Sequence, residues 1–293
     1  MNELRSARAA QPAWAALGTA ERARRIGALV LRYTFLYTRS VPRVLEIFFW
    51  PVMDLLVWGC LTLYLRGVSR PVEFLIGAMI FWDILYRAQQ AVTVSFLEDI
   101  WARNVLNLFV APIRISEFIV ATYVVGFVKI LITVGVLAGL AYGIYAWSLW
   151  QMGWALLPLF ANLLLMGWAV GMMTTGLIMR WGQSAEALAW GIPFLIQPVA
   201  AVFYPLDVLP GWLQPIARAV PATHVFEGMR AVLLGQGLSW HHLGWAFGLN
   251  VIYLTGGGLF FRWMYAIARD KGLLAKLGTQ WEPGRARSTP PRL

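Results

Sequence analysis

Long apolar runs separated by polar segments occupy most of this chain. Six runs are long enough to cross a bilayer, at roughly 44–65, 72–96, 117–146, 152–179, 185–204 and 243–261. A membrane-spanning helix needs about 20 predominantly apolar residues, so each run is a candidate span. The pattern predicts an all-α membrane protein with about six transmembrane helices, contained in a transmembrane domain of residues 44–266.

The segment before the first run, roughly residues 20–39, is amphipathic rather than continuously apolar. Apolar side chains recur there at helical spacing: Ile26, Leu29, Val30, Tyr33 and Tyr37. Arg25, Arg32 and Arg39 lie seven residues apart on another side. This pattern is typical of a basic helix lying in the membrane interface. A solvated basic helix is the alternative. Either helix belongs to a predicted cytoplasmic N-terminal segment, residues 1–43.

A second amphipathic segment, residues 97–112, lies between the second and third runs. Its apolar stripe consists of Leu97, Trp101, Val105 and Phe109, and its polar positions include Glu98, Asp99 and Arg103. Acidic residues at its start suit the helix dipole, and Pro112 ends the pattern. An apolar stripe with a tryptophan in a cytoplasmic loop is typical of a helix that docks into a partner groove. The alternative is a helix that only joins two spans.

The segment at residues 205–242 is too long for a turn and too interrupted for a span. Four prolines divide it: Pro205, Pro210, Pro215 and Pro221. Thr223 is a candidate N-cap for a helix that ends near Gly235. Residues 205–235 are therefore predicted to form a re-entrant helical hairpin, because irregular backbone at membrane depth has to be buried in protein or line a cavity.

Composition and charge agree with a membrane protein and orient it. Only 13% of the residues are charged, against about 25% in soluble domains. The net charge is +10, and 18 of the 24 Lys and Arg fall in segments that six spans would place in the cytoplasm, against four in outer segments. The positive-inside rule then predicts that both termini are cytoplasmic, including a basic tail at 267–293. This rule explains the charge without nucleic-acid binding.

Several charged residues fall inside the predicted spans. The four that are farthest from the span ends are Asp54, Asp83, Arg87 and Lys129. Each costs about 2.5–3.5 kcal/mol at the bilayer centre on insertion scales. Asp83 and Arg87 are four residues apart and can pair on one helix face, and Lys129 is a candidate partner for Asp54. They are either neutralised pairs facing other helices or a polar patch that lines a cavity.

Small residues in the later spans have a simpler interpretation. Gly167 and Gly171 form a GxxxG pattern in the fourth run, and the sixth run contains the triplet 256–258. Such residues allow helices to approach closely in lipid, so we predict packing contacts here.

Motifs for catalysis and for nucleotide binding are absent from the sequence. It contains no GxxxxGK[ST] phosphate loop and no HExxH, GxSxG or CxxC motif. The histidines are His224, His241 and His242, and the adjacent pair does not converge easily on one metal ion. We therefore predict no catalytic residue, no metal site and no cofactor bound by this chain.

Two segments resemble the permease subunits of ABC-2 type transporters. The first, Phe96–Phe118, is similar to the coupling helix of that family and the turn into the third span. It carries Trp101-Ala102-Arg103-Asn104 where many members have a Glu-Arg-Gly-Thr-like run. The second, Tyr204–Gly235, is similar to the family signature after the fifth span. Its matching positions are Pro205, Leu209, Pro210, Pro221, His224, Glu227 and Arg230.

The resemblance covers about residues 20–265 and implies a function. It implies a transport subunit of the bacterial inner membrane, working as a dimer with a separate ABC ATP-binding subunit that holds ATP and Mg²⁺. ATP-driven movement would enter through the coupling segment at Glu98, Asp99, Trp101, Arg103, Val105 and Phe109. The usual direction would be export, of a drug, lipid or glycan. The alternative is a membrane-embedded channel or enzyme without an ATPase partner.

Overall fold

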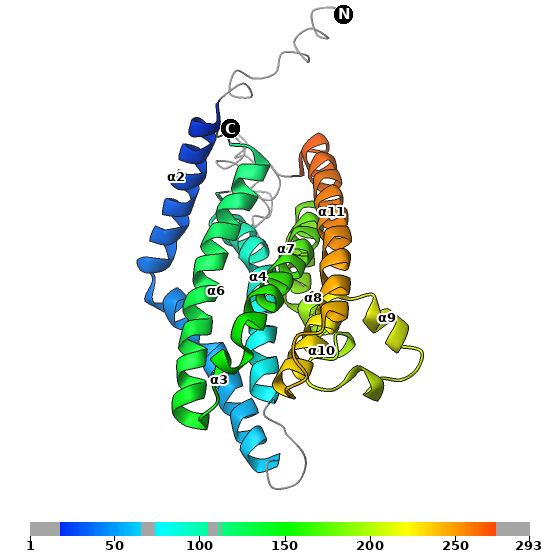
Figure 1. Cartoon of the computed structure of the whole chain (residues 1–293). Coiled ribbons are helices and arrows are strands. Elements are labelled where there is room, and N and C mark those ends of the chain that lie inside the picture. Colours follow the sequence, from blue (N-terminus) through cyan, green and yellow to red (C-terminus); the bar gives the residue numbers. More distant parts are fainter. Residues whose placement is uncertain (1–17, 66–73, 105–110, 112, 274–293) are drawn as a thin grey trace, which may run out of the picture.

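The computed structural model describes residues 18–65, 74–104, 111 and 113–273, and this part of the chain is all helical (Figure 1). It contains nine α-helices: α2 (Thr19–Thr38), α3 (Val41–Leu65), α4 (Phe74–Trp101), α6 (Ile115–Tyr145), α7 (Leu156–Trp181), α8 (Glu186–Val199), α9 (Gln214–Arg218), α10 (Pro221–Leu233) and α11 (Trp240–Asp270). Short 3₁₀ turns accompany them: η2 (Leu149–Ala155), η3 (Gly182–Ala185) and η4 (Leu206–Val208).

Helix α4 is the central element of the bundle. It packs against α7, α6, α3, α8 and α10, and α11 covers the other side of α7. Most of its residues are buried, which explains why it shows no apolar stripe in its sequence. Two hydrophobic clusters follow each other along the bundle: Phe81 and Phe226 belong to one, Phe96 and Phe118 to the other.

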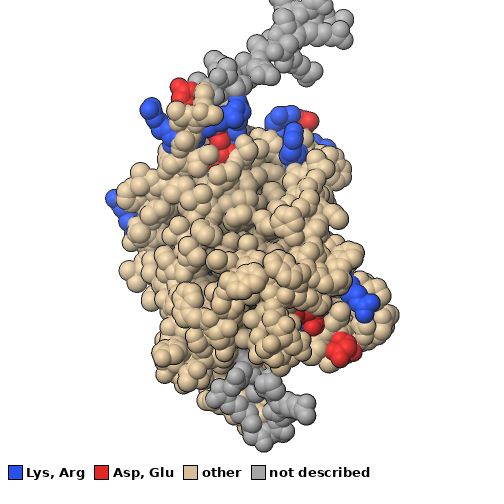
Figure 2. All heavy atoms as spheres, in the orientation of Figure 1, with Lys and Arg blue, Asp and Glu red and all other residues tan. Residues whose placement is uncertain are grey.

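Basic side chains gather at one end of the bundle. Figure 2 shows Lys and Arg concentrated where α2 begins and α11 ends, while the body between the two ends is almost entirely uncharged. The connection from α8 to α10 lies toward the opposite end (Figure 1). The molecule therefore has the uncharged belt and the one-sided basic end that the sequence predicts.

Four stretches of the described residues are long and apolar enough to cross a membrane: Val41–Leu65, Ile115–Tyr145, Leu149–Trp181 and Trp240–Asp270. The second predicted run corresponds to α4, which has 28 residues but carries Asp83, Arg87 and two glutamines within its length. The fifth corresponds to α8, which has only 14 residues. At 1.5 Å per residue, α8 is about 21 Å long, short of the ~30 Å hydrocarbon core. The expected all-helical membrane fold is confirmed at this level, and the individual crossing of α4 and α8 stays a prediction.

The predicted amphipathic helix at 97–112 does not begin as a separate element. Helix α4 continues through Leu97 to Trp101, and the chain turns at Arg103, which has a φ of 52°. The start of this prediction was wrong because Leu97 and Ile100 are buried and extend the core face of α4. Residues 105–110 and 112 lie outside the described part, including Val105 and Phe109.

Helix α2 packs along α6 and buries its apolar side. Leu29 and Tyr33 are buried there, as the helical spacing predicts. The predicted division into an apolar and a separate basic face is incomplete, since Arg25 forms an ion pair with Glu117 of α6. This contact turns part of the basic face toward the bundle.

Three glycines let neighbouring backbones touch. A Cβ on Gly167 would lie 2.4 Å from the Cβ of Ala88, and one on Gly171 would lie 2.6 Å from the carbonyl oxygen of Gln89. A Cβ on Gly257 would lie 2.9 Å from the carbonyl oxygen of Ala169. The GxxxG pattern therefore packs α7 against α4, and the central glycine of the triplet packs α11 against α7.

The segment from α8 to α11 is built from short helices broken by prolines. Pro221 is the first residue of α10, and Val220 rather than Thr223 holds the N-cap position. Proline suits the first helical turn because its missing N–H has no intrahelical partner there. The predicted end near Gly235 is confirmed, since α10 ends at Leu233 and Gly235 has a φ of 76°.

Candidate functional site

A cavity of about 740 Å³ lies beside α4 and gathers the charged residues of the predicted spans. Asp54, Asp83, Arg87 and Lys129 all line it. Its walls come from α3, α4, α6 and α8, with Tyr37 of α2 and Phe203 after α8. Its volume falls within the ~300–1,000 Å³ typical of ligand pockets. The four charged residues thus meet at one cavity, and both interpretations apply in part, since Asp83 and Arg87 are also paired with each other.

Arg87 pairs with Asp83 and also donates a hydrogen bond to a backbone carbonyl of α3. Its Nε donates to Asp83 Oδ2 at 2.7 Å, which confirms the predicted pair. Its second terminal nitrogen donates to the carbonyl oxygen of Ile47 at 2.6 Å. Pro51 lies four residues after Ile47 and has no N–H to give that carbonyl. Arg87 thus fills the gap that Pro51 leaves in α3.

The same arrangement recurs on the opposite wall. Pro193 lies inside α8 and cannot donate to the carbonyl oxygen of Ala189. The side-chain amides of Gln89 and Gln90 donate to this oxygen at 3.3 and 3.0 Å. Helix α4 therefore supplies donors to one proline-interrupted carbonyl in each of two helices that wall the cavity, α3 and α8. These glutamines were not predicted from the sequence, although a proline four residues after a carbonyl indicates that the carbonyl needs another donor.

Lys129 and Asp54 do not pair, contrary to the expectation. Lys129 Nζ lies 3.9 Å from the centroid of the Tyr37 ring, in a cation–π contact. Asp54 has no hydrogen bond or ion pair with any of the described residues. The two residues face the same cavity from α6 and α3 but have different surroundings.

An aromatic stack bounds the cavity where α8 ends. The rings of Trp58 and Phe203 are stacked with centroids 3.8 Å apart, and both rings line the cavity. Phe203 follows a turn in which Ala201 has a φ of 51°. This stack joins α3 to the segment that leads into α9 and α10.

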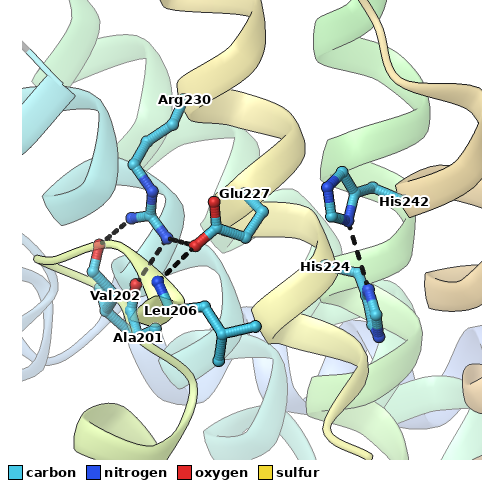
Figure 3. Close-up of polar contacts among 7 residues, drawn as sticks. All are labelled: Ala201, Val202, Leu206, His224, Glu227, Arg230 and His242. Carbon is cyan, nitrogen blue, oxygen red and sulfur yellow. Dashed lines mark hydrogen bonds and ion pairs between the residues drawn. The ribbon is translucent and has the colours of Figure 1, made fainter. Parts of the chain in front are cut away.

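Arg230 and Glu227 of α10 hold that turn in place (Figure 3). Arg230 donates to the carbonyl oxygens of Ala201 and Val202 at 2.9 and 3.2 Å. Glu227 accepts from Arg230 at 2.7 Å and from the backbone N–H of Leu206 at 2.8 Å. These two residues of the 205–235 motif therefore fix the position of the segment that carries Phe203.

His224 occupies the other side of α10, where it faces α11 (Figure 3). Its Nε2 lies 2.8 Å from the carbonyl oxygen of Arg218, so this nitrogen carries the proton and donates. Its Nδ1 lies 3.4 Å from Nδ1 of His242. Burial lowers the pKa of His224, which favours the neutral ring. Across the described residues, no three His, Cys, Asp or Glu side chains come together as metal ligands would.

A polar cluster ties α2 to the end of α4 near the basic end of the bundle. Asp99 forms an ion pair with Arg32 and accepts from Tyr33 at 2.8 Å. Glu98 accepts from Tyr37 at 3.2 Å and lies 3.6 Å from Arg43. Burial and the adjacent Asp99 carboxylate raise the pKa of Tyr33, so its hydroxyl stays a donor. Glu98 and Asp99 are 7% and 1% exposed, so these contacts lie inside the subunit, and their predicted role in coupling to the ATPase stays a prediction.

Trp101 has a different environment from the two acids beside it. It is 47% exposed, and its Nε1 donates to Glu186 at 3.3 Å. Glu186 is the first residue of α8, where a carboxylate also suits the helix dipole. Trp101 therefore connects the end of α4 to a helix that walls the cavity.

Comparison with known proteins agrees with this architecture. Residues 26–234 match the family described as ABC-2 type transporter. Over 174 residues the chain is 26% identical to the protein named "Inner membrane transport permease YadH" in Escherichia coli strain K12, and equally to its counterpart in Shigella flexneri. The alignment covers 56% of this chain and 63% of those relatives. Because the family match extends over more than half of the chain, this protein belongs to the ABC-2 type transporter family.

Proposed function

We propose that this chain is the membrane subunit of an ATP-driven exporter and that the cavity between α3, α4, α6 and α8 holds the cargo. The main observation in support is that this cavity is lined by Asp54, Asp83, Arg87 and Lys129 and by seven aromatic side chains of the membrane region. A drug, a lipid or a glycan-type molecule are the cargo classes that the family relationship leaves open.

The energy comes from a separate ABC ATP-binding subunit, which holds ATP and Mg²⁺, and two copies of each subunit form the transporter. Movement enters at the end of α4, within the coupling segment 97–112. Trp101 transmits this movement to α8 through its hydrogen bond to Glu186. The ion pairs of Asp99 with Arg32 and of Glu98 with Arg43 make α2 and the start of α3 move together with α4. These links support a rigid connection between the proposed ATPase contact and the cavity wall.

The proposed orientation places both chain termini in the cytoplasm, with the basic end of Figure 2, where α2 begins and α11 ends, on the cytoplasmic side. The 205–235 hairpin then lies on the outer side, and the Trp58–Phe203 stack closes the cavity there. Single cysteines test this orientation in a Cys60→Ala background. Gln236 and Ser184 are both exposed, so only the side of the membrane decides whether a cysteine there reacts. An impermeant thiol reagent applied to intact cells should therefore label Gln236→Cys on the outer side and leave Ser184→Cys on the cytoplasmic side unlabelled. The reverse labelling would overturn the orientation.

Co-expression with an ABC ATP-binding subunit, followed by reconstitution in liposomes, tests the function itself. Panels of drugs, lipids and glycans are scored for stimulation of ATP hydrolysis and for ATP-dependent movement. Phe203→Ala should uncouple hydrolysis from movement, because it removes the ring stacked on Trp58. Phe247→Ala is the control, an exposed ring on α11. A chain that associates with no ATPase, or that moves cargo without ATP, would contradict the proposal.

A further inference from the structure

One face of α3 alternates acidic and indole side chains along the cavity. Glu46, Trp50, Asp54 and Trp58 follow one another at four-residue spacing, and all four line the cavity. Four residues of helix advance the chain by about 6 Å, so the two carboxylates lie about 12 Å apart along the axis with an indole between them. This arrangement forms a strip of alternating carboxyl and indole side chains, here called the acid–indole strip.

The carboxylates of the strip lack the partners that the other acids of the cavity have. Asp83 is paired with Arg87, and Glu98 lies against Arg43. Neither Glu46 nor Asp54 forms an ion pair or hydrogen bond within the described residues. The remaining base, Lys129, is held over the Tyr37 ring. Asp54 is therefore a carboxyl group that lies between two indoles of the strip and is paired with no base of the cavity.

We infer that the cavity binds amphipathic organic cations, with the acid–indole strip as their recognition surface. This inference rests on the proposed function and narrows its cargo from three classes to one. A positive charge over an indole face gains cation–π energy, and it also compensates Asp54. An aromatic or aliphatic body fills the space bounded by Trp82, Tyr86 and Phe194, which line the same cavity.

The other cargo classes fit this surface less well. An anionic lipid headgroup attracted to Lys129 would also meet Asp54 and Glu46 in the same cavity, and like charges in a partly desolvated site repel strongly. A neutral glycan can stack on tryptophan, but it leaves the charge of Asp54 uncompensated. A cation, in contrast, interacts favourably with the indoles and with the carboxylate.

Two ions of the same shape and opposite charge provide the test. The full chain in lipid nanodiscs is titrated with tetraphenylphosphonium and with tetraphenylborate, and binding is measured by calorimetry and by quenching of tryptophan fluorescence. Empty nanodiscs of the same lipid correct for partition into the bilayer. We expect saturable binding of the phosphonium and at least a ten-fold weaker response to the borate.

Isosteric substitutions then locate the site. Asp54→Asn should weaken phosphonium binding by about ten-fold, which corresponds to ~1.4 kcal/mol, and Trp50→Ala by about two- to five-fold. Asp270→Asn and Trp263→Phe on the exposed face of α11 are the matched controls and should bind as wild type. Thermal melting of each variant confirms that the fold is retained, and Glu46→Gln serves as the second carboxylate variant if Asp54→Asn melts early.

Equal binding of both ions, or an affinity for phosphonium that neither carboxylate variant alters, would overturn the inference. The proposed function fails differently. A complex that couples ATP hydrolysis to movement of a neutral or anionic molecule, but binds no phosphonium, refutes the cation site and leaves the exporter standing. Charge-selective binding that depends on Asp54, in a chain that couples to no ATPase, supports the cation site and refutes the exporter.

Discussion

Arg87 has two roles that a single substitution cannot separate. It compensates the Asp83 charge and donates to the Ile47 carbonyl that Pro51 leaves without a partner. Arg87→Ala should therefore destabilise the protein by about 3 kcal/mol or more, because removing one member of a buried pair leaves the other charge uncompensated. Asp83→Ala should also be harmful, and the double variant less harmful than the two single losses combined. Unfolding in mild detergent measures all three.

An exposed ion pair provides the comparison. Arg269 and Asp270 lie 3.2 Å apart with side chains 64% and 68% exposed, and removing either should change stability little. Additive losses at Asp83 and Arg87 would show that the two side chains act independently. Restoration of the Arg87→Ala variant by Pro51→Ala would identify the Ile47 carbonyl as part of the loss.

His224 makes the contact between α10 and α11 sensitive to acid. Burial lowers the pKa of its ring, so the folded state resists a proton that the unfolded chain accepts near pH 6.5. Stability is therefore lost as the pH falls below about 6.5 and is unaffected by this group above it. Melting temperatures at pH 7.5 and 5.5 should differ less in His224→Gln than in wild type. His241→Gln, at an exposed neighbour, should keep the wild-type difference.

Residue-level spacing predicted local pairs well and distant ones poorly. Asp83 and Arg87 are on one helix, so their separation of four residues was enough to pair them. The prediction that Lys129 pairs with Asp54 was wrong. Lys129 contacts Tyr37 of α2, and no periodicity within a span shows which helix will lie opposite. The Ile47 carbonyl was missed for the same reason.

At the scale of helices, α4 supports two neighbours whose hydrogen-bond ladders are interrupted by proline. Gln90→Leu should destabilise the protein by about 1 kcal/mol, because the Ala189 carbonyl loses its shorter hydrogen bond. The same substitution should cost less in a Pro193→Ala background, where residue 193 regains an N–H that can reach Ala189. Unfolding of the two single variants and the double variant gives the coupling free energy.

Gln197 is the control for that comparison, since it lies on α8 and lines the same cavity. Gln197→Leu should have the same effect in both backgrounds. An equal cost of Gln90→Leu with and without Pro193 would mean that the Ala189 contact does not stabilise α8.

The contact between α7 and α11 depends on one glycine out of three. A Cβ at Gly257 would lie 2.9 Å from a backbone oxygen, whereas Gly256 and Gly258 have no atom within 4 Å of that position. Gly257→Ala should lower the melting temperature, because a backbone carbonyl cannot move aside as a side chain can. Gly256→Ala and Gly258→Ala should be neutral or slightly stabilising. Equal effects at all three positions would contradict the packing geometry.

Hydropathy identified α3, α6, α7 and α11 as candidate spans, but it is a weaker guide to α4, whose crossing of the membrane stays a prediction. A helix surrounded by other helices can carry glutamine, arginine and aspartate, so α4 is less apolar than a lipid-facing span. Segment 97–112 was divided wrongly because its stripe at Leu97 and Trp101 continues the face of α4. Glycine contacts were predictable as a class, but only the structure separates Gly257 from its neighbours.

For the molecule as a whole, a chain of contacts joins the basic end to the segment at residues 205–235. Glu98 and Asp99 fasten α2 to α4, Trp101 joins α4 to α8, and α8 leads to Phe203 and the turn held by Arg230. The family resemblance predicted the two ends of this chain from their motifs. The cavity between them was not predictable as a unit, because its walls come from four helices far apart in sequence.

Trp101 is the link whose loss should separate ATP hydrolysis from transport. Trp101→Ala should leave the membrane fold intact, since the side chain is 47% exposed, and should weaken assembly with the ATPase or lower transport per ATP. Trp181→Ala is the matched control, because Trp181 is 53% exposed and precedes Glu186 by only five residues. Co-purification of the ATPase and transport per ATP hydrolysed are the two measurements.

Trp101→Phe distinguishes the two ways in which this residue can act. Phenylalanine keeps an aromatic anchor but loses the Nε1 donor to Glu186. If docking on the ATPase dominates, the Trp101→Phe variant should behave like wild type. If the link to α8 dominates, the Trp101→Phe variant should behave like Trp101→Ala: the ATPase should co-purify normally while transport falls. Glu98→Arg should also impair transport, because it places a like charge beside Arg43. Wild-type assembly and transport in the Trp101→Ala, Glu98→Arg double variant would show that the end of α4 is not the coupling element.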